Sequence, residues 1–257
     1  MLDEESAFLR TICEHPGDDV PRLVFADWLQ ENGGEDRAEY IRVQIELTRL
    51  PEGDSRPPAL RGRQYELENL HREEWVRPLP EWARKRAVFE RGFVSVVEGR
   101  ANDWLRDGPA ILELTPLRGV SLLRARSSLA ELLADPTLPR LRMLDLRFNH
   151  LGDAGVAELS DSSHLQHLDT LYLWDNHIGD AGTRSLARSP MLAGLKTLSL
   201  GNNDITRHGA EELASSPHLA GLEQLVLFEN RIDEAGRRLL RERFGGRVQL
   251  ERDLDDD

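Results

Sequence analysis

Residues 195–203 read LKTLSLGNN, and the same arrangement of leucines with a final asparagine occurs at three other places in the chain. The related segments begin at Leu141, Leu168 and Leu222, so each step from one to the next is 27 residues. Within each segment, leucines two residues apart predict a β-strand, because side chains of a strand alternate between its two faces. A constant period of this length indicates a solenoid whose units bury their apolar faces against one another.

Each 27-residue unit ends its predicted strand at an asparagine, whose amide can donate to and accept from the backbone of a buried turn. The four equivalent asparagines are Asn149, Asn176, Asn203 and Asn230. After the turn, a glycine precedes a leucine by four residues, a spacing typical of a helix. The glycine suits a close approach of that helix to the strand layer. Each unit is therefore predicted to be a strand, a turn and a helix.

The pattern L-x-x-L-x-L-x-x-N-x-[LI]-x-x-x-G-x-x-x-L resembles the leucine-rich repeats of the ribonuclease-inhibitor type. The resemblance implies an α/β fold, a right-handed horseshoe with a parallel sheet inside and helices outside. A degenerate unit is expected near residue 117, and capping elements at both ends give a leucine-rich-repeat domain over residues 88–250. The first cap is expected to be one strand over residues 89–97 followed by a helix with Trp104, and the last a strand at residues 247–250.

The first 87 residues contain no LxxLxL unit and show helical spacing of apolar residues instead. Residues 1–50 are predicted to form three helices, residues 51–87 a helical linker region, and residues 251–257 an acidic, solvated tail. The segments PGDDVPRLVFADWLQ (residues 16–30) and RAEYIRVQ (residues 37–44) resemble the repeat-companion domain that precedes leucine-rich repeats in some bacterial proteins. That family carries no established activity, so the resemblance implies a bacterial origin and an architecture only.

Composition excludes several classes of protein. The net charge of −13 disfavours a nucleic-acid partner, because binding to phosphates requires a basic surface. A single cysteine, Cys13, excludes a disulfide framework and multi-cysteine metal sites. The N-terminus is acidic and no long apolar run follows it, so we expect a cytoplasmic protein without a membrane partner. We also expect the protein to be a monomer.

The inner face of the sheet is the expected binding surface, because neighbouring strands place equivalent outward side chains about 4.8 Å apart. Exposed aromatic rings together with arginine are typical of protein interfaces. The alternative is that the N-terminal helices or a loop cover these rings. The predicted partner-binding residues are Asp145, Arg147, Phe148, Tyr172, Trp174, Phe228 and Glu229.

Other chemistry-bearing residues favour structural roles. His150 and His177 are equivalent in adjacent repeats, but the next repeats have Asp204 and Arg231 near these places, so we expect no metal site and no cofactor. Cys13 lies on an apolar helical stripe and is expected to be a core thiol. The acidic residues Asp18, Asp19 and Asp27 are expected to cap helices or to pair with Arg22 and Arg37.

The sequence contains no G-x-S-x-G, G-x-x-x-x-G-K-[ST] or H-E-x-x-H motif. It therefore predicts a non-enzymatic module that binds a protein. Two alternatives remain open, an adaptor like the leucine-rich-repeat substrate receptors of F-box ubiquitin ligases and a regulator of a small GTPase. The second would make Arg147 functional, but fold alone does not confer function.

Overall fold

The computed structural model describes residues 2–51 and 54–252. By its internal contacts the chain divides into two compact units. Residues 1–98 and 107–118 form the first, here called the N-terminal unit. Residues 99–106 and 119–257 form the second, here called the repeat unit. This division differs from the boundaries expected at residues 50 and 87, because helices and strands on both sides of those positions pack together.

The N-terminal unit begins with three helices, α1 (Leu2–Glu14), α2 (Val20–Glu31) and α3 (Glu35–Arg49), as the sequence predicts. Gly33, with a φ of +83°, lies in the turn between α2 and α3. The apolar faces meet in a core that contains the buried Ile12, Phe25, Ile41 and Phe93. Aromatic contacts extend this core, since the ring centroids of Phe25 and Phe93 are 6.1 Å apart.

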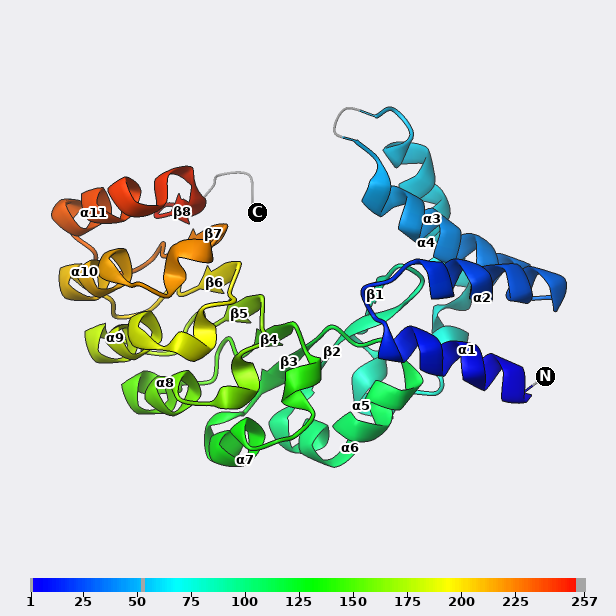
Figure 1. The fold of residues 1–257 in the computed structure, drawn as a ribbon, viewed down its shortest axis with the longest axis horizontal. Coiled ribbons are helices and arrows are strands. Elements are labelled where there is room, and N and C mark those ends of the chain that lie inside the picture. Colours follow the sequence, from blue (N-terminus) through cyan, green and yellow to red (C-terminus); the bar gives the residue numbers. More distant parts are fainter. Residues whose placement is uncertain (1, 52–53, 253–257) are drawn as a thin grey trace. The chain divides into compact units, whose positions relative to one another are not determined.

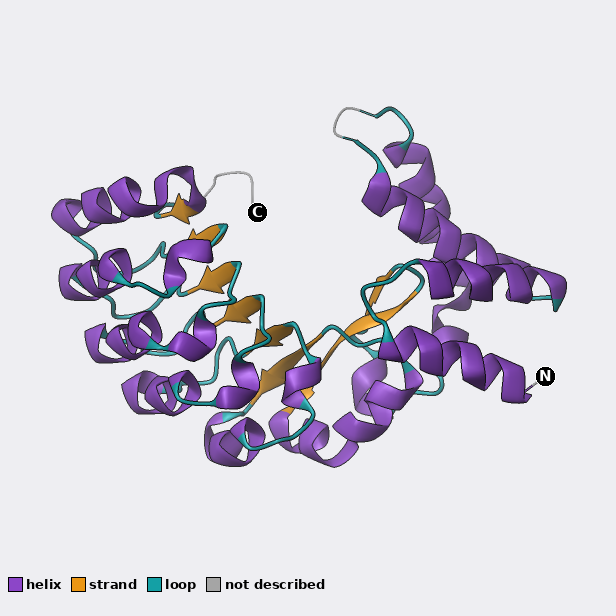
Figure 2. Ribbon diagram, in the orientation of Figure 1, coloured by secondary structure: helices purple, strands orange, loops and turns teal. Residues whose placement is uncertain are grey.

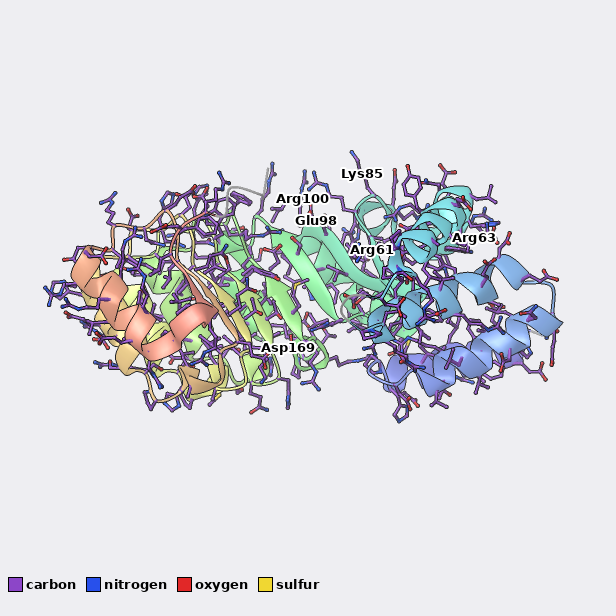
Figure 3. All side chains as sticks on the ribbon, turned by 90° about the horizontal axis from the view of Figure 1, so that it is seen from above. Arg61, Arg63, Lys85, Glu98, Arg100 and Asp169 are labelled. Carbon is purple, nitrogen blue, oxygen red and sulfur yellow. The ribbon has the colours of Figure 1, made fainter. Side chains whose placement is uncertain are left out.

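Residues 51–87 are an integral part of the N-terminal unit. They form α4 (Pro57–Val76), which runs beside α3, and the single turn α5 (Glu81–Arg84) (Figure 1). Arg63, labelled in Figure 3, donates from α4 to both carboxylate oxygens of Glu39 on α3. Deeper between the two helices, the Tyr40 hydroxyl donates to Glu68 over 2.7 Å. Burial, helped by this hydrogen bond, raises the pKa of Tyr40.

The first cap differs from the expected single strand, because residues 88–100 form an antiparallel hairpin of β1 (Val88–Glu90) and β2 (Phe93–Arg100). Arg91 and Gly92 make the turn with φ values of +50° and +88°. A Cβ on Gly92 would lie 2.3 Å from a side-chain carbon of Ile41, so only glycine fits against α3. Two left-handed residues thus reverse a chain that strand spacing alone predicts to continue.

The repeat unit contains six parallel strands in chain order, each paired with the next. They are β3 (Gly119–Leu123), β4 (Met143–Asp145), β5 (Thr170–Tyr172), β6 (Thr197–Ser199), β7 (Gln224–Val226) and β8 (Val248–Gln249). Leu144 pairs with Leu171, Leu171 with Leu198, and Leu198 with Leu225, all completely buried. The predicted leucine columns are buried as expected, and strands lie where the opening unit and the last strand are predicted.

Helices alternate with these strands and lie in a row on one side of the sheet (Figures 1 and 2). They are α7 (Leu129–Leu133), α8 (Gly152–Ser160), α9 (Asp180–Arg188), α10 (Arg207–Ser215) and α11 (Glu234–Phe244). Helix α6 (Ala101–Leu114) precedes them, and its buried Trp104 donates from Nε1 to Asp135 over 2.8 Å. Of the predicted acidic tail, residues 253–257 lie outside the described residues.

The four asparagines form the predicted ladder between repeats. Asn176 is completely buried, and its Oδ1 accepts from the backbone N–H groups of Asn149 and Leu151. Its Nδ2 donates to the carbonyls of Leu146 and Trp174. Asn203 repeats the arrangement one unit later, accepting from the N–H groups of Asn176 and Ile178. Each buried turn thus obtains its missing backbone partners from the next repeat.

Candidate functional site

Three aromatic rings gather just after the ends of strands β4, β5 and β7. Phe148, Trp174 and Phe228 make up this group, which we call the aromatic cluster. The ring centroids of Phe148 and Trp174 are 5.6 Å apart, and those of Trp174 and Phe228 are 6.0 Å apart. Both separations and the tilted or edge-on geometries are those of favourable aromatic contacts. Sequence reasoning placed these three residues in the site, and the structure brings them together.

Gly201 allows the cluster to form across a repeat that has no aromatic residue of its own. Phe228 is two repeats beyond Trp174, and Gly201 occupies the equivalent position between them. A Cβ at Gly201 would lie 3.2 Å from Cδ1 and 3.4 Å from Nε1 of Trp174, so the indole lies directly over this glycine. The Trp174 ring therefore covers the space that a side chain at position 201 would occupy.

The cluster contains a polar atom, Nε1 of Trp174, and Phe148 is its most exposed member. Nε1 of Trp174 is buried and has no hydrogen-bond partner among the described residues. An indole N–H usually finds a partner when it is buried. Phe148 is 50% exposed, whereas Trp174 and Phe228 are partly covered.

Arg147 is held beside the cluster by Asp145. Nε and Nη2 of Arg147 donate to the carboxylate of Asp145 over 2.7–3.0 Å. The guanidinium also lies 5.5 Å from the Tyr172 ring centroid, within the range of a cation–π contact. Ser121 donates to the same carboxylate from β3. Asp145 itself is only 3% exposed, so it positions Arg147 and does not present its own surface, in contrast to its expected place on the open face.

After each strand the chain enters a left-handed turn, whereas the alternation of strand side chains predicts that the strand continues. Phe148 and Glu229 have positive φ values of +62° and +59°, and so do the equivalent Asp175 and Asn202. At each of these left-handed residues the chain turns, so that the asparagine that follows points into the buried ladder. Glu229 lies at this turn, where its carboxylate is 3.8 Å from the Arg252 guanidinium. A repeated left-handed position has no hydrophobic signal and was missed, although asparagine and aspartate in the column are typical of it.

The side chains of His150 and His177 lie together as a pair. The His150 and His177 rings stack with an interplanar angle of 14°, and Nδ1 of His150 is 2.9 Å from Nε2 of His177. Among residues 2–51 and 54–252, no group of three or more histidine, cysteine, aspartate or glutamate side chains could hold a metal ion.

The N-terminal acidic residues have different partners from those expected. Asp19 pairs with Arg49, and Asp27 pairs with Arg42. Asp18 accepts from the Val20 N–H, which is the expected type of cap. Cys13 is buried, as expected for a core thiol.

The two arginines expected to pair with those acids bond differently. Arg22 donates to the carbonyls of Asp18 and Pro16. Arg37 has neither a hydrogen bond nor an ion pair to any described residue. The prediction of acid partners for these two arginines was therefore wrong.

Comparison with known proteins agrees with the repeat geometry. Residues 139–160, 164–187 and 195–214 match the family described as Leucine Rich repeat. A search among curated proteins found no match. These residues are thus similar to leucine-rich repeats, and such repeats suggest protein–protein interaction in general. None of the described helices combines the length and apolar composition needed to cross a membrane.

Proposed function

We propose that this chain is a non-enzymatic protein-interaction module whose repeats form a right-handed horseshoe with the aromatic cluster on its concave face. The observation that carries the proposal is the packing of Phe148, Trp174 and Phe228 into one surface beside Arg147. Tryptophan, tyrosine and arginine are the residues most enriched among those that dominate binding energy at interfaces.

The mechanism is binding to a surface that is formed before the partner arrives. The Trp174 indole packs over Gly201, and Asp145 holds Arg147 through two guanidinium nitrogens. Side chains that are already ordered lose little conformational entropy on association, so more of the contact energy appears as affinity.

The test is affinity capture from lysate followed by titration of each captured protein. The informative variant is Trp174→Ala with Phe228→Ala. The matched control is Arg184→Ala with Arg188→Ala, which changes two exposed side chains on α9, on the helical side of the sheet. Circular dichroism and thermal melting first establish that both variants are folded.

We expect the control to keep the partner and the aromatic variant to weaken binding by about 30-fold or more, the effect of losing at least 2 kcal/mol at a dominant contact. A partner that binds both variants equally would place the binding surface elsewhere. Absence of any partner that binds the wild-type protein would contradict the proposal.

A further inference from the structure

The N-terminal unit contains a cavity of about 290 Å³ that the proposed function does not use. This volume is near the lower end of the range that small-molecule sites occupy. Its wall is largely apolar and comes from α1–α4, β2 and residues 78–79 and 114–115. The apolar part includes Leu9, Phe25, Leu29, Leu79 and Phe93.

Arg37 is the one cationic side chain in the lining of this cavity. Its guanidinium lies 4.3 Å from the Trp75 ring centroid and 5.3 Å from that of Phe93. Nη1 is completely buried and, among the described residues, has no hydrogen-bond partner. The residue as a whole is partly exposed, but a single donor that is buried without a partner is costly, because its lost hydration is not replaced.

Two nearby arginines of the same unit use both of their Nη groups as donors, unlike Arg37. Arg72 donates to the Glu68 carboxylate and to the Ala87 carbonyl, and the buried Arg22 donates to two carbonyls. Burial lowers the pKa of Arg37 to about 10, so the side chain is still a cation at neutral pH. The cation–π contacts with Trp75 and Phe93 account for its position, and they leave Nη1 without a hydrogen-bond partner among the described residues.

We infer that this cavity binds a small monocarboxylate with a compact apolar or aromatic body, whose carboxylate pairs with Arg37. The planar guanidinium fork matches a carboxylate in geometry and charge. The apolar wall receives the body of the ligand. Glu5 and Glu74 also line the cavity, and their negative charges disfavour a dianion such as a phosphate monoester. This site is independent of the aromatic cluster.

The test uses calorimetric titration of the full chain with three probes of one shape. 3-Phenylpropionate carries the carboxylate, 3-phenylpropanamide replaces it with a neutral amide, and phenyl phosphate is the dianion. We expect 3-phenylpropionate to bind at concentrations below about 10 mM and to bind at least about tenfold more tightly than either analogue. It should also shift the Trp75 indole signal in a ¹H–¹⁵N spectrum.

Two arginine variants separate the cavity from a general effect of charge. Arg37→Met keeps an apolar stem and is expected to lose at least about tenfold in affinity. Arg42→Met removes an exposed arginine of the same helix, which pairs with Asp27 outside the cavity, and is expected to bind as wild type does. Should Arg37→Met not fold, the three probes on the wild-type protein still decide. Equal binding of the acid and the amide, or no binding of the acid, would overturn the inference.

Discussion

Asn176 has no exposed surface, and its side-chain amide is used by backbone groups of the preceding repeat and of its own repeat. Its Oδ1 accepts two backbone N–H groups and its Nδ2 donates to two carbonyls. Asn230 has the same position in the last full repeat but is only partly buried, and its Oδ1 accepts one N–H, that of Ile205. Its Nδ2 donates to the carbonyls of Leu200, Leu227 and Phe228, so the two asparagines differ in burial and in the number of N–H groups that they accept.

Asn176→Ala is expected to lower the free energy of unfolding by about 3–5 kcal/mol, because it leaves buried backbone groups without partners and opens a small space. Asn230→Ala is expected to lower it by about 1–2 kcal/mol, since water can reach part of that turn. Urea denaturation followed by circular dichroism measures both values. Equal losses in the two variants would show that the ladder does not work through burial.

Successive helices of the repeat unit are joined by aspartates at their first turns. Oδ1 of Asp153, on α8, accepts from the N–H groups of Gly179 and Gly182 at the start of α9. Asp180, on α9, does the same for Thr206 and Gly209 at the start of α10. The next repeat has Arg207 at this position, and Asp233 of the last repeat then caps its own helix through the Gly236 N–H.

Asp180 gives this capping a pH dependence. Burial alone would raise its pKa, but hydrogen bonds from the Thr206 side chain and from the backbone of Thr206 and Gly209 outweigh burial and lower it. A carboxyl whose folded-state pKa is depressed stabilises the fold above its unfolded pKa of about 3.9, and that stability is lost as pH falls through the folded value.

Asp180→Asn keeps an oxygen acceptor but no charge, and is expected to cost about 1–2 kcal/mol at pH 7. The difference from wild type should shrink as pH falls from about 5 to below 3. Urea titrations across this range measure it, with Asp161→Asn as a control at an exposed carboxylate. A difference that is constant with pH would assign the effect to packing.

The sequence predicts the repeat unit well because its signal is repeated. Leucine columns and asparagines at a step of 27 residues identify strands, turns and helices, and they also place the aromatic cluster at neighbouring strand ends. Repetition does not specify in which direction the side chain at a given repeat position points. That Trp174 lies over Gly201, or that Asp145 is buried under Arg147, depends on which residues the adjacent repeats supply.

The N-terminal unit has no such internal repetition, and sequence reasoning was correspondingly weaker there. Helical spacing predicts α1 to α3, but the contacts that attach α4 to α3 join residues far apart in the chain, such as Tyr40 and Glu68. Ion pairs are also set by tertiary structure. Asp19 pairs with Arg49, and Asp27 pairs with Arg42. Arg37, although close to these acids in sequence, pairs with neither of them.

In an array where units contact mainly their neighbours, stability is expected to depend on the number of neighbours. Strand β5 is paired on both sides, with β4 and β6, whereas the only pairing described for β8 is with β7. Local opening at the C-terminal end therefore breaks one interface, and opening at β5 breaks two. We expect amide hydrogen exchange to be slowest at Leu171 and Leu173 and faster at Val248, with α11 intermediate.

Hydrogen exchange followed by mass spectrometry or NMR checks this order, and Asn176→Ala provides the matched perturbation. Because that substitution weakens the contact between the repeats that contain β4 and β5, it should accelerate exchange in those repeats more than in β7 and β8. Equal protection of β5 and β8, with equal acceleration throughout in the variant, would mean that the repeat unit opens only as a whole. The surface that carries the aromatic cluster would then be lost in one step, instead of fraying from its Phe228 end.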